Sequence, residues 1–259
     1  LTLSVKSFPD KKGLTTGIAT AGFGLGAVMM SELAEILILK GFDILQILKI
    51  LSISYGLLIF FVSNFLFNQT ASESSVQDNG KILNLLISRI FKLLFSGLFL
   101  GTFAGLLIIG NLKMIGLQFQ INNHFLILSI SFFAVSNFAG RLFWGVLSDR
   151  IGASISIFLS LLIQSLAIIS LDFFNLNQIT FIIISSLIGF SFGGNFVLFV
   201  KETAQVYGIK SVGTIYPYIF IGYSVSGIIS PMTGGFLFDL SGSFFYSIVT
   251  ASIMSLTGS

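Results

Sequence analysis

Apolar residues along this chain form a series of long runs, each of roughly 20 residues, separated by short polar segments. A helix rises about 1.5 Å per residue, so a run of about 20 residues crosses the hydrocarbon core of a bilayer. Such a span is helical because lipid offers no partner for an unpaired backbone N–H or C=O. The pattern predicts eight membrane-spanning helices, at Gly13–Leu37, Ile44–Phe67, Phe91–Asn111, Ile121–Leu142, Ala153–Leu171, Ile179–Val200, Val212–Phe238 and a short last one at Phe244–Thr257.

One extended polar stretch interrupts this series. It runs from Asn68 to Asn84 and is rich in Ser, Gln and Asn, with Glu73 and Asp78 among them. Polar composition of this kind is typical of a flexible linker. We therefore expect residues 68–90 to connect a first helical segment, residues 1–67, to a second one, residues 91–259, with two predicted helices before the linker and six after it.

Lys and Arg are distributed unevenly between the two sides of the predicted membrane. The loops on one side carry nine of the 13 basic residues: Lys6, Lys11, Lys12, Lys81, Arg89, Lys92, Arg150, Lys201 and Lys210. The other side carries Lys40, Lys49 and Lys113. Because basic loops remain in the cytoplasm, this bias places the start of the chain, the linker and the turn at Asp149 in the cytoplasm. We expect a multi-pass protein of the plasma (inner) membrane.

The composition excludes several classes of protein. Hydrophobic residues make up 54% of the chain and charged residues only 9%, too few to cover the surface of a soluble domain. There is no Cys and only one His, His124, so neither a metal site nor a nucleophile–base pair is expected. We predict no enzyme activity, no cofactor and no nucleic-acid partner. The sequence begins with Leu1 and a basic loop, without the features of a signal peptide, and we expect that the true N-terminus is missing.

A glycine-bounded motif lies in the turn between the fourth and fifth predicted helices. It reads Gly145-Val-Leu-Ser-Asp149-Arg150-Ile-Gly152. Gly145 permits close helix approach, Gly152 permits a sharp turn, and Asp149 with Arg150 can hold a neighbouring helix end by a charge-assisted contact. The segment resembles the G-x-x-x-D-R-x-G loop signature of the major facilitator superfamily, in which it acts as a conformational switch. The basic residues that usually follow the last glycine are absent.

Two further segments are similar to a narrower group, the oxalate/formate antiporter family, which is related to the monocarboxylate transporters. One is Phe8-Pro9-Asp10-Lys11-Lys12-Gly13-Leu14-Thr15-Thr16-Gly17-Ile18-Ala19, followed by Gly22-Phe-Gly24-Leu-Gly26-Ala27, and the other is Tyr207-Gly208-Ile-Lys210-Ser-Val-Gly213-Thr214-Ile-Tyr216. The resemblance implies a twelve-helix bundle of which helices 5 to 12 are present. Residues 1–67 would then end the N-terminal six-helix half, and residues 91–259 would form the C-terminal half.

Arg141 lies inside a predicted span. A buried Arg is costly in a membrane, so it normally faces a cavity or a partner, and its planar fork matches a carboxylate. Asn137, one turn earlier on the same face, can add a neutral donor. The resemblance implies that an Arg at this point binds the substrate carboxylate. The alternative is that Arg141 snorkels to the interface and anchors the Asp149 turn.

The substrate class follows partly from Tyr223. Oxalate-type members of the family often carry a Lys where the alignment of motifs places Tyr223, and no other Lys or Arg lies inside that span. A single cation suits a monoanion, so the leading prediction is a secondary transporter of monocarboxylates such as formate, lactate or pyruvate, working by antiport or proton symport. The alternatives are a carrier of another molecule, such as a drug or sugar, and a membrane sensor or scaffold that does not transport.

The expected partners are a small carboxylate, a coupling proton and the lipid bilayer, with the protein as a monomer. Glu32 and Glu35 are candidates for proton coupling, although a wet outer rim also accounts for them. Glycines at four-residue spacing predict faces of close helix packing rather than a nucleotide site. These glycines are Gly97, Gly101 and Gly105, Gly22 with Gly26, and Gly189 with Gly193.

Overall fold

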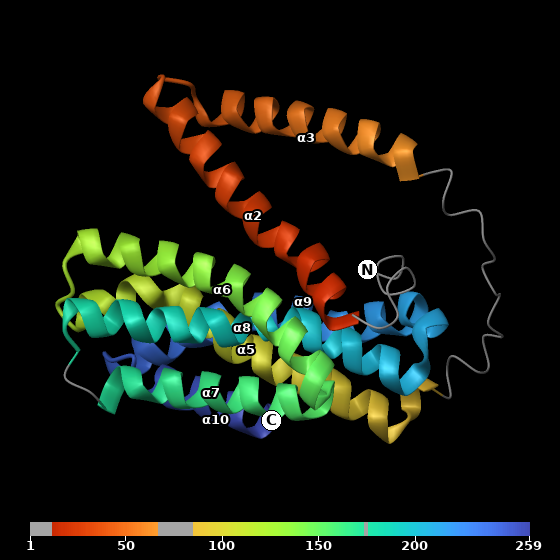
Figure 1. Cartoon of the computed structure of the whole chain (residues 1–259). Coiled ribbons are helices and arrows are strands. Elements are labelled where there is room, and N and C mark those ends of the chain that lie inside the picture. Colours follow the sequence, from red (N-terminus) through yellow and green to blue (C-terminus); the bar gives the residue numbers. More distant parts are fainter. Residues whose placement is uncertain (1–11, 67–84, 174–175) are drawn as a thin grey trace. The chain divides into compact units, whose positions relative to one another are not determined.

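The computed structural model describes residues 12–66, 85–173 and 176–259, and its long elements are all α-helices (Figure 1). They are α2 (Lys12–Leu39), α3 (Ile44–Leu66), α5 (Arg89–Gln118), α6 (Asn123–Ile151), α7 (Ala153–Phe173), α8 (Gln178–Tyr207), α9 (Ile209–Ser241) and α10 (Phe245–Gly258). The eight predicted helices and the all-α fold are thus confirmed. Most of the predicted linker, at residues 67–84, lies outside the described residues.

The helices are mostly longer than predicted. The helix predicted over Phe91–Asn111 runs from Arg89 to Gln118, because hydrogen-bonded backbone continues past the apolar run from which the helix was predicted. Among the described helices, six are long and apolar enough to cross a membrane: α3, α5, α6, α7, α8 and α9. Helix α10 has 14 residues, in keeping with the short last span that the sequence predicts.

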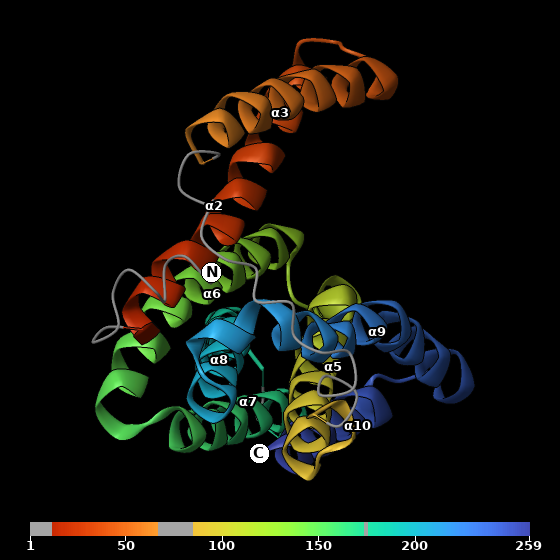
Figure 2. The same cartoon turned by 90° about the vertical axis from the view of Figure 1, so that its right-hand side faces the viewer.

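The chain divides into two compact units. One consists of Leu1–Gly24 and Asn84–Ser259, and the other is Leu25–Leu83, so α2 begins in the first unit and ends in the second. In the first unit, α6 packs most extensively on α8 and α5 on α9, while α10 packs on both α5 and α7. Figure 2, turned by 90°, shows several helices of this bundle end-on.

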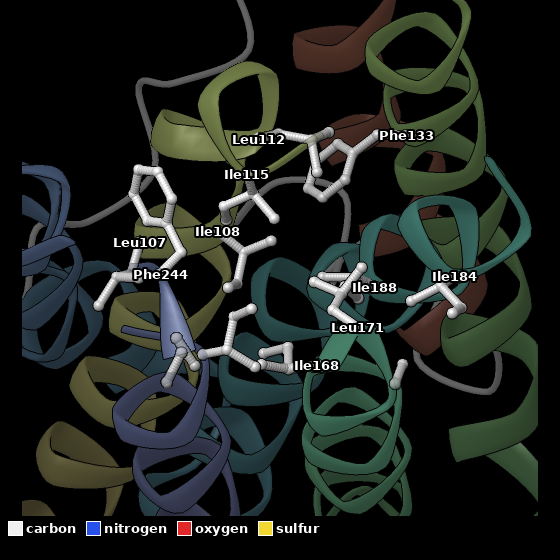
Figure 3. Packing of buried hydrophobic residues seen from close by; sticks show 14 of the residues in the cluster. Leu107, Ile108, Leu112, Ile115, Phe133, Ile168, Leu171, Ile184, Ile188 and Phe244 are labelled. Carbon is white, nitrogen blue, oxygen red and sulfur yellow. The ribbon is translucent and has the colours of Figure 1, made fainter. Parts of the chain in front are cut away.

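The core of the first unit combines aliphatic side chains with small hydroxyls. Leu107, Ile168 and Ile188, from three different helices, are fully buried in one cluster (Figure 3). Serine hydroxyls also form hydrogen bonds between helices: those of Ser165 and Ser252 lie 3.0 Å apart between α7 and α10. Small residues and interhelical hydrogen bonds of this kind hold helices together in lipid, where the hydrophobic effect does not favour one helix contact over another.

The backbones of α6 and α8 meet at three glycines. A Cβ atom would lie 2.0 Å from the carbonyl oxygen of Phe190 if added at Gly140, and 2.4 Å from that of Phe133 if added at Gly189. At Gly193 it would lie 2.3 Å from the carbonyl oxygen of Asn137. Close packing at Gly189 and Gly193 is therefore confirmed, and it fixes the distance between the two helices that carry the candidate site.

The other predicted glycine faces divide into two cases. Gly97, Gly101 and Gly105 of α5 each face a side chain of a neighbouring helix within van der Waals distance, as a packing face requires. A Cβ added at Gly22 or Gly26 would meet no described atom within 4 Å. The close helix packing predicted for this pair is therefore not found among the described residues.

Candidate functional site

Arg141 of α6 is a buried cation whose hydrogen bonds go to neutral groups. The residue is only 7% exposed. Its Nε donates to Oδ1 of Asn137, one turn earlier, at 3.0 Å, and a terminal nitrogen donates to the carbonyl oxygen of Thr20 in α2. The structure thus brings Arg141 and Asn137 together on one helix face. Asn137 supports the arginine from the side and does not line the adjacent cavity.

The guanidinium carbon lies over an aromatic ring. The Cζ atom of Arg141 is 4.6 Å from the ring centroid of Phe196 in α8. Gly193, almost one turn earlier, lets the backbone of α8 approach Asn137 and Arg141, which positions the Phe196 ring beside the cation. A cation over an aromatic face is held by the ring quadrupole without neutralising its charge.

A cavity of about 560 Å³ opens beside this cation. Its lining is mostly aromatic and consists of Thr20, Arg141, Phe196, Tyr216, Pro217, Phe220 and Tyr223. The size is within the range of small-molecule sites, roughly 300–1,000 Å³. Tyr223, singled out from the sequence, therefore lies in the same cavity as Arg141.

Arg141 does not hold the Asp149 turn. Its hydrogen-bond partners in the described part of the chain are Asn137 and Thr20, and Lys201 of α8 occupies the position beside Asp149 instead. The sequence pattern placed Lys201 in a loop, and that prediction is wrong. Lys201 lies within α8, because the helix continues to Tyr207. Its side chain is 4% exposed.

Asp149 joins three helices at one end of the bundle. Its carboxylate accepts the backbone N–H groups of Gly13 at 2.9 Å and Leu14 at 3.1 Å, in the first turn of α2. It also accepts from Nζ of Lys201 at 2.6 Å, and the same Nζ donates to Ser148 at 3.1 Å. A carboxylate at a helix N-terminus satisfies free N–H groups and complements the positive end of the helix dipole.

Two glycines bring α2 and α6 into backbone contact beside this ion pair. A Cβ added at Gly13 would lie 2.1 Å from the carbonyl oxygen of Gly145, and one added at Gly145 would lie 2.5 Å from that of Gly13. Gly145 thus permits the close helix approach that its motif suggests. Only at this separation does the Asp149 carboxylate reach the first N–H groups of α2.

The other two motif residues differ in their surroundings. Gly152 has a φ of 89° and its N–H bonds to the Ser148 carbonyl oxygen at 3.0 Å, so the sharp link from α6 to α7 needs a glycine. Arg150 is exposed and pairs with no acidic residue in the described chain. The charge-assisted contact expected of Asp149 and Arg150 is therefore made by Asp149 alone.

Three aromatic residues of the cavity, Phe196, Tyr216 and Phe220, were not assigned to the site from the sequence, although Tyr216 ends one of the family motifs. Tyr216, Phe220 and Tyr223 recur at helical spacing on one face of α9, a signal that the sequence contains. This spacing is difficult to recognise as a site in a chain that contains 30 Phe residues. The described residues include no group of three His, Asp or Glu able to hold a metal ion.

Comparisons with a family model and with known proteins agree on the kind of protein to which this chain is similar. The family model described as Major Facilitator Superfamily matches residues 93–259. The chain is 27% identical over 250 residues to YhjX, an uncharacterized MFS-type transporter of Escherichia coli strain K12, covering 88% of this chain and 58% of that protein. It is 25% identical over 228 residues to the oxalate:formate antiporter of Oxalobacter formigenes, covering 85% of this chain and 54% of that protein. The chain thus spans little more than half the length of either relative.

Proposed function

The chain belongs to the Major Facilitator Superfamily, and we propose that it is part of a secondary active transporter of small organic anions, monocarboxylates in particular. The carrier works by alternating access, as antiport or as symport with a proton. The name of the Oxalobacter formigenes relative, an oxalate:formate antiporter, supports a small anion as cargo.

The observation that carries this proposal is the uncompensated charge of Arg141. Its partners are an amide oxygen, a backbone carbonyl and an aromatic ring, and no described carboxylate pairs with it. A buried cation in a membrane protein is costly unless an anion or water offsets it. An anionic substrate in the adjoining cavity supplies that counter-charge. A guanidinium pairs better with a carboxylate than with a neutral molecule such as a sugar.

The cavity supports one negative charge rather than two. Arg141 is the only Lys or Arg in the described lining. The family resemblance implies, in addition, that Tyr223 stands where oxalate-type members often carry a Lys. A dianion in this half of the site would leave one charge without a cation. Asn137 takes part by fixing the Nε side of the guanidinium, which leaves for the substrate the terminal nitrogen that does not donate to the Thr20 carbonyl oxygen.

The conformational switch of the carrier, on this proposal, is the contact between Asp149 and the first turn of α2. Gly145 allows the contact, Gly152 shapes the turn, and Arg150 adds positive charge at the surface. Rocking of the two halves breaks the bonds to Gly13 and Leu14 and opens this end. Each bond is of moderate strength, so repeated opening is compatible with turnover.

The same proposal assigns the remaining parts of the molecule. Residues 1–67 end the N-terminal half, residues 68–90 form a cytoplasmic linker, and residues 91–259 form the C-terminal half. The carrier is a monomer in the plasma (inner) membrane, with the Asp149 end in the cytoplasm. The side chains of Glu32 and Glu35, the candidates for proton coupling, lie outside the described residues.

The test is uptake of labelled formate, lactate and oxalate by the full-length protein in proteoliposomes. Three proteins are compared: the wild type, Arg141→Gln, and the control Arg89→Gln, which removes an exposed arginine outside the cavity lining. We expect saturable uptake of a monocarboxylate by the wild type and the control. Arg141→Gln should lose it by at least about 100-fold while inserting and purifying normally.

Other outcomes lead to the other function classes. Carboxylate uptake that is indifferent to Arg141 would show that this arginine has only a structural role. Uptake of a drug or sugar with no carboxylate uptake would identify a different carrier of the same superfamily. Absence of any transport by a correctly inserted wild type would favour a sensor or scaffold.

A further inference from the structure

Four aromatic rings form a continuous surface in the cavity beside Arg141. We call Phe196, Tyr216, Phe220 and Tyr223 the aromatic wall. Ring centroids are 5.2 Å apart for Phe196 and Tyr223, 5.0 Å for Phe220 and Tyr223, and 5.6 Å for Tyr216 and Phe220. These separations are those of favourable aromatic pairs, so the wall is preformed before any ligand arrives.

The wall differs from the aromatic packing elsewhere in the bundle. Phe196, Phe220 and Tyr223 are only half-buried and line the cavity, whereas Phe181 and Phe244 are almost fully buried in the core. Filling the core does not require side chains that face open space. The exposed parts of these three rings are therefore available to a ligand, whereas Tyr216, the fourth member of the wall, is buried.

The cation lies at the edge of this wall. The guanidinium carbon of Arg141 lies over the ring of Phe196, which is in turn in edge contact with Tyr223. With Nε held by Asn137 and one terminal nitrogen donating to the Thr20 carbonyl oxygen, a carboxylate meets the other terminal nitrogen of Arg141. The rest of the molecule then extends along the wall, because the carboxylate is anchored where the wall begins.

From this juxtaposition we propose that the cargo is a monocarboxylate with a planar aromatic group, its carboxylate on Arg141 and its ring on the aromatic wall. The inference rests on the proposed function and narrows its substrate class. Formate would satisfy the arginine and leave the wall uncovered. A second carboxylate would lie against aromatic carbon instead of a cation, so oxalate is disfavoured.

The tyrosine hydroxyls add a polar element to this site. The hydroxyls of Tyr216 and Tyr223 have no hydrogen-bond partner within the described chain, and both residues line the cavity. They can donate to a carboxylate oxygen or bond to a polar substituent on the ring. A site of this kind combines an apolar surface with a few placed donors, as small-molecule sites generally do.

The experiment measures binding to the purified full-length protein by calorimetry and by thermal shift. The probes are benzoate, cyclohexanecarboxylate, formate, oxalate and benzamide. We expect the Kd of benzoate to be at least about tenfold lower than that of cyclohexanecarboxylate or formate, since only a planar ring stacks on the wall. Benzamide, which has the ring without the charge, should not bind measurably.

Two matched variants localise the preference. Phe220→Leu, which removes one ring of the wall, should weaken benzoate binding about three- to tenfold and leave formate unchanged. Phe143→Leu is the control, because Phe143 contacts Phe190 and Trp144 in a separate aromatic cluster outside the cavity lining. It should leave both affinities unchanged.

The possible failures are distinguishable. Formate, cyclohexanecarboxylate or oxalate binding as tightly as benzoate, with binding still lost in Arg141→Gln, would overturn the aromatic inference and leave the carboxylate carrier standing. Equal binding of benzamide and benzoate, or no binding of any carboxylate, would overturn the proposed function itself. If Phe220→Leu and Phe143→Leu weakened benzoate binding equally, the placement of the benzoate ring on the aromatic wall would be wrong.

Discussion

The ammonium group of Lys201 lies 2.6 Å from the same Asp149 carboxylate that caps the first turn of α2. Lys201 is 4% exposed and Asp149 is 20% exposed, so the pair is largely shielded from water. The cation holds the carboxylate in the orientation that accepts the N–H groups of Gly13 and Leu14. One ion pair thus links α6 and α8 to the end of α2.

Replacement of Lys201 by Met should loosen this end of the bundle. We expect a loss of about 1–3 kcal/mol of stability, because the variant leaves a partly buried carboxylate without its cation. The contact with α2 should break more often, and a Thr20→Cys reporter in the cavity should react faster with maleimide. This chain contains no other Cys. Lys210→Met, at an exposed lysine near the same end, is the control and should leave labelling unchanged.

Substitution of Gly145 by Ala should separate α2 from α6. The added Cβ would lie 2.5 Å from the carbonyl oxygen of Gly13, a backbone atom that cannot move without shifting a helix. Faster labelling of the Thr20→Cys reporter is expected here too, together with a lower melting temperature. Gly227→Ala in α9 is the comparison, because its Cβ would meet nothing within 4 Å. A gain of about 0.5–1 kcal/mol from helix propensity is expected for it, and equal losses in the two variants would contradict the steric argument.

The sequence predicted the helices well because hydrocarbon thickness and backbone hydrogen bonding impose one length and one conformation on each span. It also predicted that Arg141 and Asn137 share a face, since four-residue spacing in a helix decides this alone. Lys201 was misplaced because apolar length marks where the membrane ends, whereas α8 continues past that point to Tyr207.

The aromatic wall was beyond the sequence for a different reason. Phe196 reaches Arg141 only because Gly193 brings α8 onto α6, a contact between residues far apart in the chain. Helical spacing on α9 groups Tyr216, Phe220 and Tyr223 on one face without indicating whether that face meets lipid, the core or a cavity. Tyr223 was found through the family motif and not through its spacing.

Replacement of Tyr223 by Lys should change the charge preference of the cavity. The variant places a second cation beside Arg141 in a lining that is mostly aromatic, which favours a dianion over a monoanion. We expect the ratio of oxalate to formate uptake to rise at least about tenfold, the effect of roughly 1.4 kcal/mol of added attraction. Tyr223→Phe, which keeps the ring without the hydroxyl, should leave the ratio near its wild-type value. An unchanged ratio in a stable, correctly inserted Lys variant would place the substrate away from Tyr223.

Asn195 allows a prediction about stability, because this buried amide has an unused donor. The residue is 1% exposed and its Nδ2 has no hydrogen-bond partner in the described structure. Leaving such a group unpaired in an apolar bundle costs about 1–3 kcal/mol, so Asn195→Leu, of similar size, should raise the melting temperature or leave it unchanged.

Gln164→Leu is the matched variant on α7. The Gln164 amide also has one unpaired atom, Oε1, but its Nε2 donates to the Gly101 carbonyl oxygen at 2.8 Å, and loss of that bond should destabilise by about 1 kcal/mol. Thermal unfolding of the two proteins side by side, followed through the buried Trp144, decides the matter. If Asn195→Leu were the less stable of the two, Asn195 would have a partner in the membrane-embedded protein, such as a buried water, and the α5–α8 contact would be hydrated instead of dry.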